Sequence, residues 1–169
     1  KGDLVTLSSS ESNQRIIQIP PAEAAFVSMN PKNGHIKTYI GGTNFLKTKF
    51  DRVRQSFPQT GSSFKPFIYA SAISRGYDAS SLINDAPIIF EDENLEDYWR
   101  PENYTKKFYG LTRLREALVQ SINIVSIKLL RNIGVENVRN DLQAFGFEKR
   151  RLPSDLSLAL GSSSFSPIE

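Results

Sequence analysis

Two short stretches, 24–29 and 36–40, are rich in residues that favour β-strands. The six residues between them include proline, glycine and two asparagines, a composition typical of a hairpin turn. The pattern therefore predicts an antiparallel hairpin, with Val27 and Met29 on one face and Phe26 and Ser28 on the other. A two-stranded hairpin is only marginally stable alone, so we expect further strands or a helix to cover it.

Apolar residues at helical spacing dominate the chain after residue 60. The first predicted helix ends at Gly76, a natural C-terminal stop. Its expected buried side chains are Phe67, Ile68, Ala70 and Ile73. Thr112 is expected to cap a second helix, residues 124–130 form an apolar run stopped by Gly134, and residues 135–145 form an amphipathic helix that ends at Gly146. Residues 77–110 are expected to be mostly loop.

The two ends of the chain differ from the middle. In residues 1–21, two short apolar pieces flank a serine-rich run and are halted by Pro20 and Pro21, which we interpret as the end of a preceding module plus a linker. Residues 166–169, Ser-Pro-Ile-Glu, form a capping box with proline at the first helical position, so they predict the start of another helix. Because the chain also starts at Lys1 and not at methionine, we expect it to be a piece of a longer protein.

Composition narrows the possible functions. The 169 residues are 39% hydrophobic with a net charge of +3 and no dense basic run, which suits a globular protein and gives nucleic-acid binding little support. The chain has no cysteine, and we expect its single histidine, His35, to be an exposed hairpin residue. The acidic stretch 91–97 lacks the glycine and spacing of a calcium loop. We therefore expect no metal and no cofactor.

Ser62 and Lys65 form an S-x-x-K motif at the start of the first apolar helix. Residues three apart share one helix face, with Cβ atoms roughly 5–6 Å apart, so the lysine amine could take the proton of the serine hydroxyl. Gly61 permits a tight turn into the helix. Pro66 lacks an N–H, so it requires a helix start or a local distortion. In a chain with 20 serines and 10 lysines, chance yields about one such spacing, so the motif depends on its surroundings.

Ser121 and Asn123 form a second motif, S-x-N, at a break between predicted helices, where side chains can project into a cleft. The spacing alone is weak, and residues 28–30 repeat it at a strand end. Its weight comes from its place in the chain, since a long loop and a helix separate it from the S-x-x-K motif.

These motifs and the longer stretches around them resemble the transpeptidase domain of class A, bimodular penicillin-binding proteins. The motif set of that family is S-x-x-K, S-D-N and K-T-G. The stretches that carry the resemblance are QTGSSFKPFIY (59–69), INDAPI (83–88), WRPENY (99–104), FYGLTRLREAL (108–118), QSINIV (120–125) and LALGSSSFSPIE (158–169). Two departures are visible. Ile122 replaces the aspartate of S-D-N, which the family commonly tolerates, and the K-T-G motif is absent from the 169 residues.

The resemblance implies an α+β fold class, in the form of a partial penicillin-binding and serine β-lactamase-like transpeptidase fold. The chain would contain a β-hairpin of the central sheet and the helical subdomain, with the remaining strands missing. Residues 1–21 would be the end of a preceding linker domain and residues 22–169 the N-terminal portion of a truncated transpeptidase domain. Such a partial sheet exposes an edge, which would invite self-association.

The same resemblance implies roles for the motif residues. Ser62 would attack the carbonyl between the two terminal D-alanines of a peptidoglycan stem peptide, and Lys65 would be the base. Ser121 would relay a proton to the leaving amine, and Asn123 would bind the substrate amide. A free lysine has a pKa of ~10.4, so a base that works near pH 7–8 requires roughly 3–4 kcal/mol in favour of the neutral amine. Burial, a second cation or a helix N-terminus would act in that direction.

The implied partners are peptidoglycan stem peptides and β-lactam antibiotics, which would acylate the same serine. The implied location is the periplasmic face of the bacterial inner membrane, with a glycosyltransferase domain and a membrane anchor in a longer parent. No apolar run in this chain approaches the roughly 20 residues that cross a bilayer.

Three alternatives remain open from the sequence. A serine β-lactamase shares the acylation chemistry but must deacylate quickly, and no clear motif for a deacylating glutamate is present. A penicillin-recognising sensor would be acylated without turnover. A structural piece would use the S-x-x-K pair only as a solvated helix end. The resemblance favours the transpeptidase, and the missing K-T-G motif predicts little or no turnover by these residues alone.

Overall fold

The computed structural model describes residues 6–10, 13–17, 22–89 and 99–169. The chain divides into two compact units, residues 1–56 with 166–168 and residues 57–165 with 169. Pro20, Pro21 and the acidic stretch 91–97 lie outside the described residues. The described part combines helices with three two-stranded sheets, so the predicted α+β class is confirmed.

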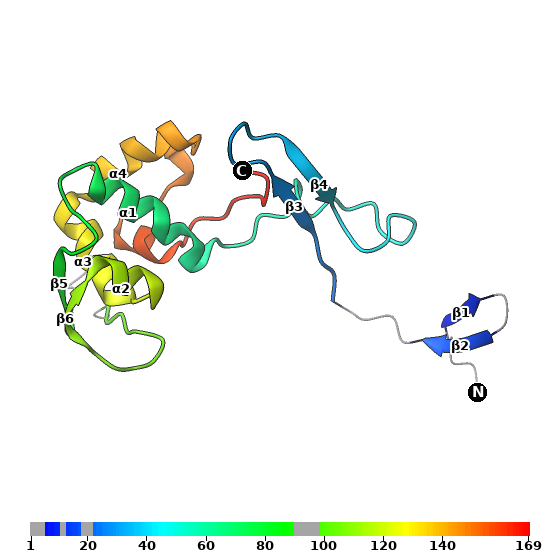
Figure 1. Cartoon of the computed structure of the whole chain (residues 1–169), viewed down its shortest axis with the longest axis horizontal. Helices are drawn as coiled ribbons and strands as arrows, with labels where there is room; N and C mark the ends of the chain where they lie inside the picture. Colours follow the sequence, from blue (N-terminus) through cyan, green and yellow to red (C-terminus); the bar gives the residue numbers. More distant parts are fainter. Residues whose placement is uncertain (1–5, 11–12, 18–21, 90–98) are drawn as a thin grey trace. The chain divides into compact units, whose positions relative to one another are not determined.

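Two antiparallel hairpins form the strands of the first unit (Figure 1). Strand β1 (Thr6–Ser10) pairs with β2 (Asn13–Ile17), so the first three serines of the serine-rich run belong to a strand. Strand β3 (Phe26–Met29) pairs with β4 (Ile36–Ile40), which confirms the predicted hairpin. Gly34 makes the turn between β3 and β4 with φ +71°. His35 is exposed, as expected.

The pairing of β3 with β4 changes register close to the turn. Phe26 pairs with Ile40, but a β-bulge between Ser28 and Met29 shifts the register, so that Met29 pairs with Ile36. The extra residue is Lys37, so the bulge interrupts the alternation of side chains on β4. Phe26 and Met29, at the two ends of β3, are both exposed.

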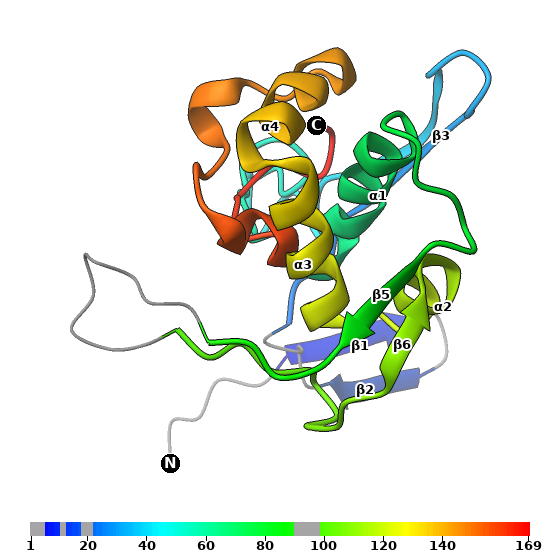
Figure 2. The same ribbon diagram turned by 90° about the vertical axis from the view of Figure 1, so that its left-hand side faces the viewer.

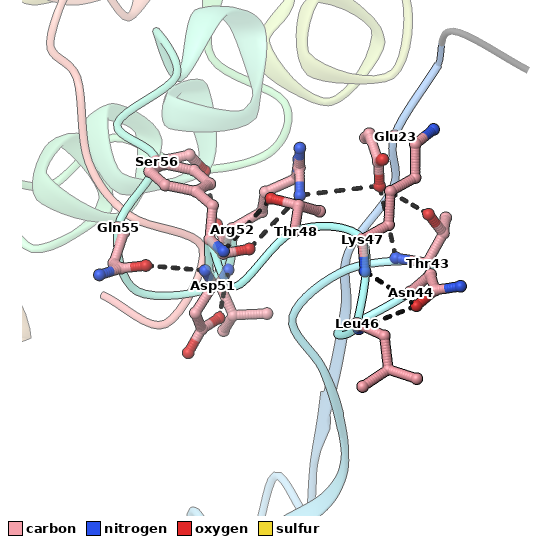
Figure 3. A network of polar contacts seen from close by, with 12 residues as sticks. Glu23, Thr43, Asn44, Leu46, Lys47, Thr48, Asp51, Arg52, Gln55 and Ser56 are labelled. Carbon is pink, nitrogen blue, oxygen red and sulfur yellow. Dashed lines mark hydrogen bonds and ion pairs between the residues drawn. The ribbon is translucent and has the colours of Figure 1, made fainter.

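Polar contacts hold the loop that follows β4 to the residues before β3. The Glu23 carboxylate accepts a hydrogen bond from Thr43 Oγ1 (2.6 Å) and lies 3.7 Å from the Arg52 guanidinium (Figure 3). Within the loop, the Asp51 N–H donates to Gln55 Oε1 (2.7 Å). The β3–β4 hairpin and this loop therefore form one structural piece.

The second unit is built around helix α3 (Asn123–Ile133), which contacts α1 (Lys65–Ile73), α2 (Leu114–Val119), α4 (Val135–Leu142) and η4 (Leu156–Leu160) (Figure 2). The remaining 3-10 segments are η1 (Gly61–Phe64), η2 (Gln143–Phe145) and η3 (Lys149–Arg151). A helix that is apolar around most of its circumference belongs inside a domain. The buried residues of α3 are Ile124, Val125, Ser126, Ile127, Leu129, Leu130 and Ile133.

Strands β5 (Leu82–Asp85) and β6 (Gly110–Arg113) form an antiparallel pair where the sequence predicted mostly loop. Thr112 is therefore not the cap of the second helix. It is buried in β6 opposite Ile83, and α2 begins after Arg113 without a side-chain cap.

The remaining helix predictions concern where helices end and which of their faces is buried. Gly76, Gly134 and Gly146 all have positive φ where the sequence predicted helix ends. Ile73 is exposed, contrary to expectation, because α1 turns a different face to the core. The residues of that face follow helical spacing: Lys65, Ile68, Tyr69 and Ala72. Residues 167–168 form a turn, and the helix that the capping box predicts stays a prediction.

Candidate active site

The S-x-x-K motif lies on a 3-10 turn that leads into α1. The Lys65 N–H donates to the Ser62 carbonyl, which is the tighter i to i+3 bond of a 3-10 segment. Pro66, in the first turn of α1, has no N–H with which to make the wider α-helical bond. Gly61, at φ +55°, provides the turn before it. Of the two settings expected for Pro66, the structure shows the helix start, directly after one turn of 3-10 helix.

Backbone hydrogen bonds connect this turn to a segment near the C-terminus. Residues 161–165 run antiparallel to residues 58–61, with an isolated bridge between Gln59 and Ser164. The Thr60 N–H donates to the Ser163 carbonyl and the Gly61 N–H to the Gly161 carbonyl, both over 2.9 Å. Two of the stretches that carried the resemblance, 59–69 and 158–169, are thus adjacent in space.

The S-x-N motif lies between α2 and α3. Ser121 has φ +53°, in the left-handed region that residues other than glycine rarely adopt, at a cost of about 1–2 kcal/mol. Ile122 is the N-cap residue of α3, and its aliphatic side chain makes no capping hydrogen bond. This backbone path places Ser121 and Asn123 on the same side of the junction, towards α1.

Lys65 joins the two motifs. Its side chain is buried, with 1% exposed, and Nζ donates to Ser121 Oγ (3.0 Å), the Ser121 carbonyl (2.7 Å) and Asn123 Oδ1 (2.8 Å). These contacts match the three donors of a lysine ammonium. No hydrogen bond in the described residues links Lys65 Nζ to Ser62 Oγ, and Ser62 is exposed. The structure therefore gathers three of the four predicted site residues by hydrogen bonds, with Ser62 one turn away.

Burial lowers the pKa of Lys65 to about 8, because the charged ammonium loses hydration inside the unit. Of the three causes that the sequence suggested, desolvation is the one that acts. With a pKa of about 8, roughly one molecule in ten carries the neutral amine at pH 7. A lysine in this state can accept a proton under physiological conditions.

Two residues that the sequence did not assign to the site contact it directly or through one partner. Asn103 Oδ1 accepts hydrogen bonds from the N–H of Asn123 (3.0 Å) and of Ile124 (3.2 Å). Asn103 Nδ2 in turn donates to both carboxylate oxygens of Asp85 (2.9 and 3.0 Å). Their only signal in the sequence was membership of the stretches 83–88 and 99–104.

The aromatic residues of the stretch 99–104 behave differently from each other. Trp99 packs against the hydrophobic core, whereas Tyr104 is completely exposed. Core packing therefore accounts for the position of Trp99, whereas the Tyr104 side chain lies in solvent.

Comparison with known proteins identifies the family. The family model for the penicillin binding protein transpeptidase domain matches residues 24–165. The chain belongs to this family. Penicillin-binding protein 1A of Pseudomonas aeruginosa is 44% identical over 169 residues, which are 99% of this chain and 21% of that protein. Penicillin-binding protein 1A of Vibrio cholerae is 44% identical over 155 residues, 92% of this chain and 19% of that protein.

A solved penicillin-binding protein has the same fold. The crystal structure of penicillin-binding protein 1A from Haemophilus influenzae superimposes with a TM-score of 0.87 and 38% identity, over 95% of this chain and 24% of that one. PonA1 from Mycobacterium tuberculosis, at 23% identity and a TM-score of 0.72 over 88% of this chain and 42% of that one, shares the fold. The chain spans about a fifth of the length of the curated relatives that it matches.

Membership of the penicillin-binding transpeptidase family confirms the resemblance and the partial transpeptidase fold. It supports an acyltransferase role and the peptidoglycan transpeptidase interpretation, and it does not favour the β-lactamase or sensor alternatives. Within the described residues, no helix combines the length and apolar character needed to span a membrane.

Proposed function

We propose that this chain supplies the nucleophile, the base and the proton relay of a peptidoglycan D,D-transpeptidase that acts on stem peptides ending in D-alanyl-D-alanine. The observation that carries the proposal is the contact of Lys65 Nζ with both residues of the S-x-N motif, one turn from Ser62. A buried amine with a pKa of about 8, next to an exposed serine, fits general-base activation of a hydroxyl.

In the first step, Ser62 Oγ attacks the carbonyl carbon between the two D-alanines while its proton passes to the neutral Lys65 amine. The backbone N–H of Ser62 is one donor to the developing oxyanion. The C–N bond then breaks, Ser121 passes the proton from Lys65 to the leaving amine, and free D-alanine departs. Asn123 binds the substrate amide and keeps it in line with Ser62.

In the second step, the ester at Ser62 is attacked by an amine from a neighbouring stem peptide. The amine loses its proton through Ser121 to Lys65, the C–O bond to Ser62 breaks as Lys65 returns that proton to Ser62 Oγ, and a new amide joins the two stems. A β-lactam enters the same first step, but opening of its ring leaves the acyl group and the amine in one molecule. The ester at Ser62 then persists, and this is the basis of the proposed covalent binding of β-lactams.

We further propose that the site is completed by other parts of a longer chain. The 169 residues contain no K-T-G sequence, and the chain spans about a fifth of the length of its relatives. In this proposal residues 1–21 end a linker domain, and the transpeptidase domain starts at residue 22. The longer protein would carry a glycosyltransferase domain and a membrane anchor and would act on the periplasmic side of the inner membrane.

The test is labelling of the longer protein with a fluorescent penicillin, followed by intact mass and peptide mapping. We expect one label per molecule, located on Ser62, and none on the Ser62→Ala variant. A label that persists in Ser62→Ala, or that maps to another residue, contradicts the proposal. The 169-residue chain alone is expected to label slowly or not at all, since each oxyanion donor contributes about 10²–10³ in rate.

A further inference from the structure

A buried polar network connects β5 to the start of α3. Asp85, at the end of β5, is completely buried, and Asn103 is 4% exposed. Asn103 Nδ2 donates to both oxygens of Asp85 and to the Lys107 carbonyl (2.8 Å), while the Tyr109 N–H donates to Asp85 Oδ2 (2.9 Å). Burying a carboxylate and an amide is unfavourable unless they are hydrogen-bonded, and here the partners are present.

Asn103 replaces a missing helix cap. The first N–H groups of any helix have no partner inside the helix, and the side chain of the N-cap residue commonly accepts from one of them. In α3 the N-cap residue is Ile122, which has no acceptor on its side chain. The Asn103 side chain, twenty positions earlier in the sequence, accepts from Asn123 and Ile124 instead.

Asp85 determines which way the Asn103 amide points. A carboxylate only accepts hydrogen bonds, so it faces Nδ2 and leaves Oδ1 to face the backbone N–H groups of α3. The opposite orientation would place two acceptors together at Asp85 and two donors together at α3. The orientation that caps α3 is therefore fixed from the other side by Asp85, together with the Lys107 carbonyl, which also accepts from Nδ2.

The same short stretch also holds the side chain of Asn123. Asn123 Nδ2 donates to the Glu102 carbonyl (2.9 Å), which turns Oδ1 towards Lys65 Nζ. Residues 102–103 thus fix both the backbone and the amide of Asn123. A continuous series of hydrogen bonds runs from Asp85 through Asn103 and Asn123 to Lys65.

We propose that Asn103, oriented by Asp85, is a positioning residue for acylation: it holds the S-x-N segment at the distance that lets Ser121 and Asn123 reach Lys65 Nζ. This inference rests on the proposed function. Neither residue touches the substrate in this proposal. Their effect passes through the backbone at the start of α3, where a displacement of about 1 Å is enough to lower a rate about 100-fold.

The test compares variants of the longer protein in labelling with a fluorescent penicillin, measuring separately the acylation rate constant and the fraction of molecules that label. Asn103→Ala is expected to lower the rate constant about 10- to 100-fold while the labelled fraction stays near that of the unchanged protein. Asp85→Ala is expected to act similarly. The double variant is expected to be no slower than Asn103→Ala alone, because both changes act through one amide.

Two controls separate positioning from loss of fold. Asn84→Ala removes an exposed asparagine side chain from the same strand as Asp85. Asp141→Ala removes a carboxylate that accepts from Ser71 and Arg75 elsewhere in the unit. Both are expected to keep the acylation rate constant, even where Asp141→Ala lowers the melting temperature. Amide hydrogen exchange provides a readout independent of activity, with faster exchange at Asn123 and Ile124 expected in Asn103→Ala and in neither control.

Each outcome bears on the inference in a defined way. An unchanged rate constant in Asn103→Ala, or a loss confined to the labelled fraction, would overturn the positioning role and leave the proposed function intact. Unchanged hydrogen exchange at Asn123 and Ile124 would overturn the capping role. Absence of labelling at Ser62 in the unchanged protein would overturn the proposed function, and the role in acylation with it.

Discussion

The backbone of Gly161 lies directly against that of Gly61, and the Gly61 N–H donates to the Gly161 carbonyl over 2.9 Å. Gly161 has φ +69°, and a Cβ atom placed on it would overlap main-chain atoms of Gly61. Main-chain atoms cannot rotate aside as a flexible side chain can. Any side chain at position 161 must therefore displace the turn that carries Ser62.

An alanine in the left-handed conformation costs about 1–2 kcal/mol, and Gly161→Ala is expected to destabilise the chain by more than this. The same variant is expected to slow penicillin labelling of Ser62. Gly146→Ala is the matched control, because Gly146 has φ +94° and a Cβ atom added to it would meet no other atom within 4 Å. Urea unfolding measures the first effect and labelling the second. Equal losses of stability in the two variants would show that the close approach is unimportant.

The protonation of Lys65 predicts the pH dependence of acylation. Burial lowers the pKa of Lys65 to about 8, so the amine is mostly charged below that pH and cannot accept the Ser62 proton. The acylation rate constant is expected to fall about tenfold per pH unit below about pH 8 and to level off above it. Lys65→Arg, which stays protonated, should lose about 10²–10⁴ in rate above about pH 8 and should lack this pH dependence. A flat profile between about pH 6 and about pH 9 in the unchanged protein would contradict the role of Lys65 as base.

Asn123→Asp is expected to move this profile to higher pH. Asn123 Oδ1 lies 2.8 Å from Lys65 Nζ, and a carboxylate at that distance favours the ammonium and so raises the pKa of Lys65. The control is Asn140→Asp, which places a carboxylate next to a different lysine, Lys149, whose Nζ lies 2.7 Å from Asn140 Oδ1. Labelling across the pH range should show a shifted midpoint for the first variant and an unchanged one for the second.

Local patterns were sufficient for some of the fold. The turn composition of residues 30–35 predicted the β3–β4 hairpin, and glycines predicted helix ends at positions 76, 134 and 146. Each of these depends on the backbone preference of a few neighbouring residues. The family resemblance, and through it the pairing of the S-x-x-K and S-x-N motifs, required whole stretches of sequence.

These local patterns could not predict pairing between residues that lie far apart in the sequence. Strands β5 and β6 have four residues each and lie more than twenty positions apart, so no hairpin signal connects them. Thr112 looked like a helix cap because its pairing with Ile83 leaves no local trace. For the same reason the sequence did not predict the capping role of Asn103, because the helix that it caps is a separate element. Within the described residues Lys65 Nζ makes no hydrogen bond to Ser62 Oγ, and the sequence did not predict this, because Nζ is occupied by residues of the distant motif.

The β3–β4 hairpin predicts self-association of the 169-residue chain. Within the described residues its sheet contains only these two strands, and the opposed pair Phe26 and Ile40 is about half exposed. Unpaired edges with exposed apolar residues favour association, and lysine on such an edge opposes it. Ile40→Lys is expected to reduce the sedimenting mass at a given concentration. Ile73→Lys, at an exposed position of α1, is the control and should leave the mass unchanged.

Because Ser121 has a left-handed backbone conformation, we expect replacement by glycine to cost less stability than replacement by alanine, which reverses the usual order. Both Ser121→Ala and Ser121→Gly remove the hydroxyl, so both should lower the acylation rate constant to a similar extent. Glycine alone tolerates φ +53° without steric cost, so Ser121→Gly is expected to be more stable than Ser121→Ala by about 1 kcal/mol. Urea unfolding of the two variants checks the order, and an alanine variant at least as stable as the glycine variant would contradict it.

Serine at position 121 thus combines an unfavourable backbone conformation with the hydroxyl that the proposed reaction needs. Engineers who screen libraries of this protein only for heat tolerance or yield should see glycine enriched at this position, in clones that have lost their reactivity towards penicillin. A screen meant to keep both stability and reactivity has to measure penicillin labelling in every round.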